Sequence, residues 1–178
     1  MTKIIAFAGS SSRNSINNKL AIYAASLFEN VEVEILDLND YELPLFSVDR
    51  EKELDKPMIA RTFLNKMSSC DIIVLSLAEH NASFTVAFKN IYDWASRQDK
   101  VVFSNTPMLL LATSPGQGGG RNVLETAKIS MPKYGANIKA TFSLPLFNEN
   151  FDSEQKKISN PEYDQKLREI VKNFDATR

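Results

Sequence analysis

Residues 9–17 combine hydroxyl, amide and guanidinium groups in a pattern that suits phosphate binding. They read GSSSRNSIN and stand between an apolar run and an amphipathic stretch. A helix that begins here would add unpaired backbone N–H groups and the positive end of its dipole. The Gly-Lys-Ser/Thr of a nucleotide-triphosphate loop and the GxGxxG dinucleotide fingerprint are both absent. We therefore expect a terminal monophosphate; the alternative is that the serines only cap the helix.

Residues 78–86, AEHNASFTV, form a second candidate stretch. The amide of Asn81 and neighbouring backbone amides could hydrogen-bond the edge of a planar heterocycle. His80 and Phe84 could pack against its face, and Glu79 lies on the same loop. The alternative is a polar turn, with Phe84 in the core and His80 in solvent.

Residues 113–121, TSPGQGGGR, hold four of the six glycines in the chain. Glycine adopts positive φ angles and lets the backbone approach a ligand closely. We expect a flat ring to lie against this loop, and valine at Gly119 to block the ring without disturbing the fold. The alternative is a flexible connection that ends at a helix.

The composition limits what other chemistry the chain can perform. One cysteine, Cys70, and one histidine, His80, allow no internal disulfide, no CxxC pair and no zinc-ligand spacing. No base stands near the loop serines, so we predict neither a catalytic side chain nor a metal. With 21 basic and 22 acidic residues there is no basic excess for nucleic acid. No apolar run approaches the roughly 20 residues of a membrane span, and we expect a cytoplasmic protein.

Apolar runs and amphipathic stretches alternate along the chain. The runs lack polar alternation, which is typical of strands buried on both faces, and they cover residues 3–8, 31–36, 71–76, 107–113 and 138–144. The helical stretches cover residues 17–28, 58–67, 86–94, 121–131 and 162–173. Residues 41–57 and 148–160 are expected to be surface connections.

This alternation predicts an α/β fold with a parallel sheet covered by helices on both faces. We find no boundary inside the chain and expect one domain over residues 1–178. Ligands of such sheets bind outside the carboxyl ends of the strands, where the strand order reverses. The three candidate stretches follow the first, third and fourth predicted strands, so they are expected to meet at that edge. A phosphate cradle and two walls for a flat ring indicate a mononucleotide site, for flavin or purine.

The three stretches together resemble the NADPH-dependent FMN reductase family, which includes quinone, chromate and azo-dye reductases. Residues 9–21 are similar to G-S-x-R-x-x-S-x-N-x-x-L-A, residues 78–94 to P-E-Y-N…L-K-N-x-x-D-W, and residues 114–121 to S-P-G-x-x-G-G-x-R. The resemblance covers residues 3–147. Ser12 replaces the arginine of the first motif, with Arg13 one residue later. Ala78 and His80 stand where the family has proline and tyrosine.

The resemblance implies a flavodoxin-like three-layer sandwich with a five-stranded parallel sheet of order 2-1-3-4-5, and an FMN site. The implied cofactor-binding residues are Ser10, Ser12, Arg13, Ser15, Ile16 and Asn17 around the phosphate, and Glu79, His80, Asn81, Ser114, Pro115, Gly116, Gly119 and Gly120 around the ring. It also implies ping-pong transfer of a hydride from NADPH or NADH through FMN to a quinone, flavin or similar small acceptor. The flavin itself carries this chemistry.

Family members are commonly dimers or tetramers, so the resemblance implies a homodimer or homotetramer. Residues 92–97, with Trp94, are a candidate interface segment; the alternative is that Trp94 fills the core. Two other functions stay open: an electron carrier of the flavodoxin type, and a non-enzymatic module that binds FMN or another nucleotide. The nearly neutral charge disfavours the carrier, because flavodoxins are usually strongly acidic.

Overall fold

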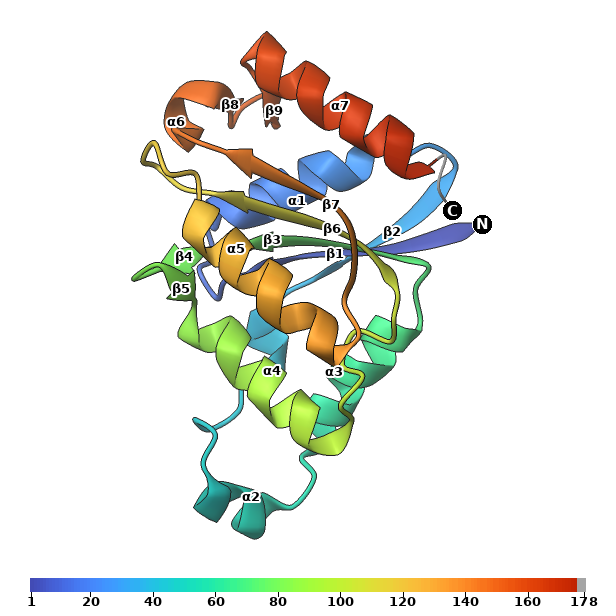
Figure 1. Ribbon diagram of the computed structural model, residues 1–178, viewed down its shortest axis with the longest axis vertical. Helices are drawn as coiled ribbons and strands as arrows, with labels where there is room; N and C mark the ends of the chain where they lie inside the picture. Colours follow the sequence, from blue (N-terminus) through green and yellow to red (C-terminus); the bar gives the residue numbers. More distant parts are fainter. Residues whose placement is uncertain (176–178) are drawn as a thin grey trace.

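A computed structural model describes residues 1–175. They form a five-stranded parallel sheet with helices packed against it (Figure 1). The strands are β1 (Thr2–Gly9), β2 (Val31–Leu36), β3 (Ile72–Leu77), β6 (Pro107–Thr113) and β7 (Asn137–Leu144). They lie in the order β2-β1-β3-β6-β7, and every neighbouring pair is parallel. Counted along the chain this is the order 2-1-3-4-5, so the predicted fold is confirmed.

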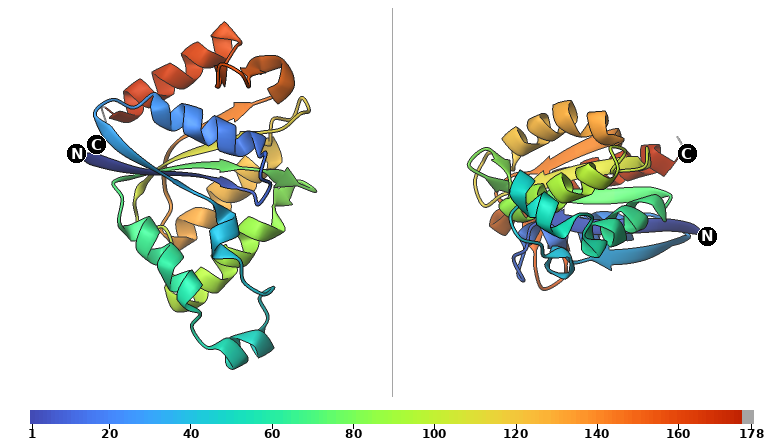
Figure 2. Two further views of the ribbon diagram at one scale, coloured as in Figure 1. Left: turned by 180° about the vertical axis from the view of Figure 1, so that it is seen from behind. Right: turned by 90° about the horizontal axis from the view of Figure 1, so that it is seen from below.

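Helices cover both faces of the sheet and give three layers (Figures 1 and 2). One face carries α1 (Ile16–Ser26) and α7 (Pro161–Asp175). The other carries α3 (Met58–Ser68), α4 (Val86–Gln98) and α5 (Arg121–Ser130). The predicted helices agree with these to within a few residues. The order of the strands reverses between β1 and β3, whose carboxyl ends lead into the first two candidate stretches.

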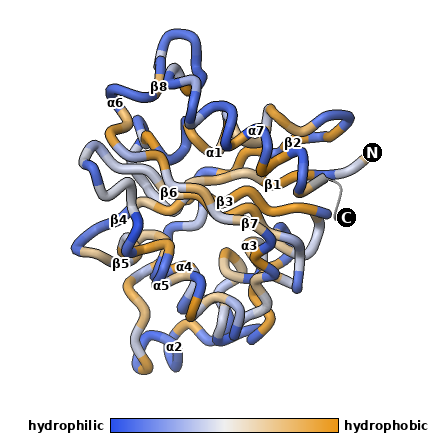
Figure 3. The backbone as a smooth tube through the Cα atoms, turned by 45° about the horizontal axis from the view of Figure 1, so that its top comes forward, coloured by the Kyte–Doolittle hydropathy of each residue, from blue (hydrophilic) through white to orange (hydrophobic). Residues whose placement is uncertain are grey.

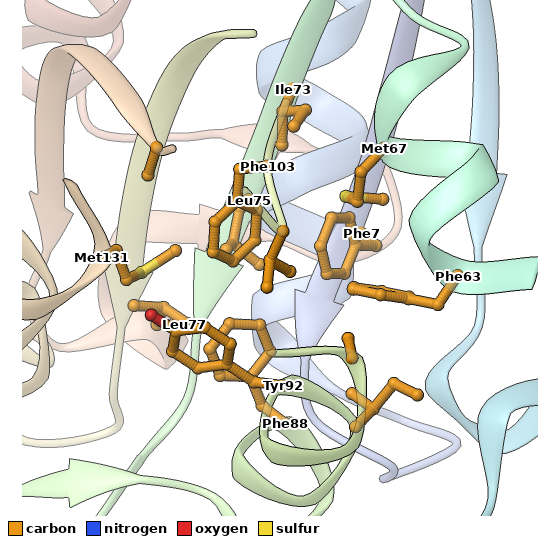
Figure 4. Packing of buried hydrophobic residues seen from close by; sticks show 14 of the residues in the cluster. Phe7, Phe63, Met67, Ile73, Leu75, Leu77, Phe88, Tyr92, Phe103 and Met131 are labelled. Atoms are coloured by element: carbon orange, nitrogen blue, oxygen red, sulfur yellow. The ribbon is translucent and has the colours of Figure 1, made fainter. Parts of the chain in front are cut away.

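The apolar strands are buried on both faces, as their lack of alternation predicts. In β1, Phe7 packs edge-to-face on Phe63 of α3, with ring centroids 6.1 Å apart. Ile4 and Ala6 belong to the opposite core, beneath α1 and α7. Figure 3 shows the central strands as the most apolar part of the backbone, and Figure 4 shows the aromatic and aliphatic packing under α3, α4 and α5.

Two apolar residues at the starts of helices are exposed to solvent. Ile59 is 38% exposed and Val86 is 66% exposed. Both belong to the first turn of their helices, α3 and α4. The residues that pack each helix on the sheet include Phe63 of α3 and Phe88 of α4, and both of these rings are fully buried.

The connections contain structure that the sequence pattern does not reveal. The predicted loop 41–57 begins at the end of the 3₁₀ helix η1 (Leu38–Tyr41) and includes the short helix α2 (Val48–Leu54). The segment 148–160 includes most of α6 (Phe147–Asn150) and the hairpin of β8 (Phe151–Asp152) and β9 (Lys157–Ile158). A second hairpin, β4 (Glu79–His80) with β5 (Ser83–Phe84), follows β3, and the 3₁₀ helix η2 (Met131–Tyr134) follows α5.

Residues 42–57, called the arm below, extend away from the sheet and are fastened to α4 (Figures 1 and 2). Trp94 is fully buried, and its indole N–H donates to the carbonyl of Pro44 at 2.8 Å. Its ring packs edge-to-face on Phe46, with centroids 5.1 Å apart. The alternative that Trp94 fills the core is therefore correct, because no part of its ring reaches the surface. The expectation that residues 92–97 contribute to a subunit interface stays a prediction.

Candidate functional site

The loops that follow β1, β3 and β6 meet at the carboxyl edge of the sheet around a cavity of about 290 Å³, called the central hollow below. Nine of the expected residues line it: Ser10, Ser12, Ser15, Ile16, Asn17, Glu79, His80, Ser114 and Pro115. A neighbouring cavity of about 260 Å³, the side hollow, shares Ser10, Ser12 and His80 with it and reaches Val86 and Ala87 of α4. The predicted convergence of the three stretches is confirmed.

The loop after β1 presents backbone donors to the central hollow. Ser15 caps α1, and its hydroxyl oxygen accepts the N–H of Asn18 at 3.2 Å. Within residues 1–175, the N–H groups of Ile16 and Asn17 have no hydrogen-bond acceptor. Unpaired amides at the N-terminus of a helix attract an anion, and the exposed hydroxyl of Ser12 lies beside them. The loop therefore caps α1 through Ser15 and leaves two backbone N–H groups available to an anion.

Arg13 lies on the same loop, is exposed, and does not line the central hollow. It borders an adjacent small recess of about 30 Å³, which is also lined by Ser10, Ser12 and Ser15 of this loop and by Asp37 after β2. The expectation that Arg13 binds the phosphate stays a prediction.

The Asn17 side chain has a structural role that its position in the sequence does not reveal. It is buried, and its Nδ2 donates to the carbonyl of Thr113 at 3.1 Å. Its Oδ1 accepts the N–H of Thr113 at 3.0 Å and the hydroxyl of Ser76 at 2.7 Å. The amide thus joins α1 to the ends of β3 and β6. What Asn17 offers a ligand is its backbone N–H, which corrects the expectation of a side-chain donor.

The β4–β5 hairpin forms the second wall of the central hollow. Its two-residue turn, Asn81 and Ala82, has positive φ angles of 51° and 59°. His80 borders both hollows, whereas Asn81 lies exposed at the tip and borders neither. Phe84 packs on Phe88 with ring centroids 5.4 Å apart. The core alternative for Phe84 is therefore correct, and Asn81 does not line the cavity because the turn carries it outward.

The loop after β6 divides into a part that lines the hollow and a part that packs inside the protein. Ser114 and Pro115 line the central hollow, whereas Gly116 is exposed outside it. Gly119 and Gly120 are buried with φ angles of 58° and 75°. A Cβ atom on Gly119 would stand 2.4 Å from Ser143 Oγ, and one on Gly120 would stand 2.7 Å from the Cβ of Ala112. These last two glycines are thus required for packing and do not line the central hollow.

The cavity and its donors fit a phosphorylated flat ring. The unpaired amides and serine hydroxyls suit a monophosphate, and the space between the hairpin and Pro115 suits a planar ring. Within residues 1–175, no group of His, Cys, Asp and Glu side chains is arranged to hold a metal ion. Burial raises the pKa of the Cys70 thiol to about 11, so this thiol is not an activated nucleophile. No helix in the described part of the chain is long and apolar enough to cross a bilayer.

A family model described as NADPH-dependent FMN reductase matches residues 2–140. The chain belongs to the NADPH-dependent FMN reductase family. This membership confirms the resemblance seen in the three motifs. It also makes the chain an NAD(P)H-dependent oxidoreductase that uses FMN, as the sequence predicts.

Curated and solved proteins are similar to this reductase over most of its length. An NADPH:quinone oxidoreductase from Arabidopsis thaliana is 28% identical over 86% of this chain and 81% of its own. A 2-hydroxy-1,4-benzoquinone reductase from Burkholderia sp. is 34% identical over 66% of this chain and 63% of its own. The solved structure of FerB, a flavoenzyme NAD(P)H:(acceptor) oxidoreductase from Paracoccus denitrificans, has a TM-score of 0.76, with 21% identity over 98% of this chain and 95% of its own. The structural similarity confirms the flavodoxin-like fold of the reductase.

Proposed function

We propose that this reductase binds FMN in the central hollow and reduces a quinone or a similar flat small molecule. The proposal rests on one observation: three loops from distant parts of the sequence share a cavity that has anion-binding amides at one end. The phosphate is assigned to the N–H groups of Ile16 and Asn17 and the hydroxyls of Ser10 and Ser12. The isoalloxazine ring is assigned to the space between His80 and the Ser114–Pro115 pair.

The residues of the site bind and orient the reactants. Bound FMN supplies the chemistry, which is acceptance of a hydride from NAD(P)H and transfer of electrons to the acceptor. No side chain needs to act as an acid or a base, which agrees with the lack of a His-based catalytic set in the sequence. The side hollow, bordered by His80 and Val86, offers room for the nicotinamide or the acceptor next to the cofactor.

Related proteins favour a quinone as the class of acceptor. The Arabidopsis relative is named as a quinone oxidoreductase, and the Burkholderia relative as a benzoquinone reductase. An azoreductase from Bacillus sp. is 28% identical over 76% of this chain, so azo dyes are a second flat acceptor to test. All three acceptors are planar, conjugated molecules that can stack on an exposed flavin ring.

The test is the visible spectrum of the purified protein with FMN, followed after NADPH and then a benzoquinone are added. We expect NADPH to bleach the flavin absorption and the quinone to restore it. Bound FMN that NADPH does not bleach would indicate an electron carrier instead. A protein that neither contains nor takes up FMN would indicate a non-enzymatic module.

We further propose that the reductase is a homo-oligomer and works in the cytoplasm. Support for the oligomer comes from the arm and the start of α3 that follows it, where Leu45, Val48 and Met58 are each at least 60% exposed. Clustered exposed apolar side chains are typical of protein–protein contact surfaces. The cytoplasmic assignment is supported by the single thiol, which needs no oxidising compartment.

A further inference from the structure

Glu79 forms a direct side-chain link between the β4–β5 hairpin, which is one wall of the central hollow, and the start of α5, which directly follows the loop that carries the Ser114–Pro115 wall. One carboxylate oxygen accepts the backbone N–H of Val123 at 2.8 Å, and the other accepts Nδ2 of Asn122 at 3.1 Å. Glu79 is the first residue of the β4–β5 hairpin, and Val123 lies in the first turn of α5. Among the described residues, no other hydrogen bond joins residues 78–84 to residues 113–123.

The N-terminus of α5 lacks a side-chain cap of its own. Its N-cap residue is Gly120, whose left-handed φ of 75° excludes most residues that could cap by a side chain. The N–H of Val123 is at the third helical position, which an N-cap side chain normally satisfies. Glu79 takes over this role from another part of the chain, and its negative charge also suits the positive end of the helix dipole.

The hairpin in turn needs an anchor. Each of its strands has two residues, and both turn residues adopt left-handed backbone angles, which cost free energy for Ala82. An isolated two-stranded hairpin is at best marginally stable in water. Phe84 packs the second strand of the hairpin against the core. Glu79 bonds the first strand, which carries His80, to α5. The position of His80 therefore depends on that bond.

We propose that Glu79 is a positioning residue, which sets the spacing between the His80 wall and the Ser114–Pro115 wall of the flavin-ring site. The inference rests on the proposed placement of FMN in the central hollow. It assigns Glu79 a role different from direct contact with the ring, because its two carboxylate oxygens already bind α5. Loss of the carboxylate would release the hairpin while the phosphate loop, which is anchored independently through Asn17, stays in place.

The test compares FMN and riboflavin affinity in Glu79→Ala, Glu79→Gln and wild-type apoprotein, by quenching of flavin fluorescence. We expect the dissociation constants of both flavins to rise about tenfold or more in Glu79→Ala, the loss typical of removing a charged hydrogen-bond partner. Glu79→Gln keeps an acceptor for the Val123 N–H and should recover most of the affinity. The visible circular dichroism of bound FMN should change in Glu79→Ala, because the ring surroundings change.

Two control variants separate this role from other effects. Glu125→Ala removes an exposed carboxylate from the same helix, where it pairs with Lys128, and should leave both affinities unchanged. Ser12→Ala should weaken FMN and spare riboflavin, because the proposed function assigns this hydroxyl to the phosphate, which riboflavin lacks. A merely structural role of Glu79 would lower the melting temperature and leave flavin affinity and dichroism of the folded protein as in wild type.

The inference is overturned if Glu79→Ala binds both flavins as wild type does, or if it loses FMN affinity alone. Either result leaves the proposed function intact, because wild type would still bind FMN. If wild type itself binds no FMN, the proposed function fails and the inference fails with it. Hydrogen exchange of residues 79–84 in the apoprotein gives a readout without any ligand, and faster exchange in Glu79→Ala is expected.

Discussion

At the scale of single residues, the buried side-chain amide of Asn17 stabilises the fold and is not available to bind a ligand. Replacing it with alanine leaves the backbone groups of Thr113 and the Ser76 hydroxyl without their partner in a dry interior. We expect Asn17→Ala to lower the free energy of unfolding by about 3 kcal/mol, as measured by urea denaturation. Asn14→Ala, on the exposed side of the same loop, is the control and should change stability little. Equal stability of Asn17→Ala and wild type would contradict this role.

For the Tyr92 hydroxyl we expect a stability change of the opposite sign, because removing this group should not destabilise the protein. Tyr92 is buried among Phe84, Phe88, Phe103 and Tyr134, and within the described residues its oxygen has no hydrogen-bond partner. Burial raises the pKa of this phenol, because the charged form would be poorly solvated. Tyr92→Phe should therefore leave stability unchanged or raise it by up to about 1 kcal/mol in thermal unfolding. A marked loss of stability would show that the hydroxyl has a partner in solution.

Several site residues could be predicted from the sequence because they directly follow apolar runs. Ser10, Ser12, His80 and Ser114 line the cavity for this reason, which the switch-point rule expresses. The roles of Asn17 and Glu79 could not be predicted, because their partners stand 96 and 44 positions away in the sequence. Only the packing of α1 and α5 on the sheet brings these groups within hydrogen-bond distance.

At the scale of elements, the glycine-rich loop gives a test in which sequence and structure disagree. The sequence alone predicts that Gly119→Val blocks flavin binding in an intact fold. The positive φ and the contact with Ser143 and Pro145 instead predict a loss of stability of at least about 2 kcal/mol, visible in thermal unfolding. Gly116→Ala, where an added Cβ meets nothing within 4 Å, should be nearly neutral. An unchanged melting temperature with lost FMN binding would favour the sequence-based expectation.

The regular elements and the small ones differ in how far they can be predicted. The five strands and five long helices follow from runs of buried apolar residues and from amphipathic periods. The two-residue strands of the β4–β5 and β8–β9 hairpins and the seven-residue α2 are too short to carry a period. The β4–β5 hairpin is nevertheless part of the candidate site. Because the sequence pattern does not predict this hairpin, it also does not predict how the second wall of the central hollow is held in place.

At the scale of the whole molecule, α7 is fastened to α1 by a group that titrates. The Tyr23 hydroxyl donates to Asp164, and Arg168 donates to both of them. Burial, and then the hydrogen bond to Asp164, raise the pKa of Tyr23 from 10.0 to about 12. A raised pKa means that this contribution to stability is complete below pH 10 and is lost as the pH rises through 12.

We expect Tyr23→Phe to be less stable than wild type by about 1–2 kcal/mol at pH 8, because two hydrogen bonds are lost. The difference should shrink in melts recorded from pH 10 upward, as Tyr23 ionises in the wild type. Ultraviolet absorbance of the tyrosinate, compared between the two proteins, assigns the titration to Tyr23. A stability difference that stays constant over this range would argue against the linkage.

The arm is the surface through which we expect copies of the whole molecule to associate. It is fastened to α4 along one helix face: Asn90 binds the backbone of Leu43 and Phe46, Trp94 binds Pro44, and Arg97 pairs with Glu51. A rigid, projecting segment with exposed apolar side chains loses little conformational entropy when it docks on a second copy. The proposed association would bury apolar residues such as Val48, which is 60% exposed in the single chain.

We expect the wild-type protein to sediment as a dimer or tetramer, and Val48→Lys to shift the mass toward the monomer. A charge at the centre of an apolar contact loses its hydration on association, and this loss opposes docking. Ile129→Lys is the matched control, because Ile129 is 70% exposed on α5 and lies outside the arm. Both variants should keep the thermal stability of wild type when compared as monomers, since each added lysine remains in solvent. A wild-type monomer at all concentrations would contradict the proposed association, and dissociation caused by Ile129→Lys alone would move the interface from the arm to α5.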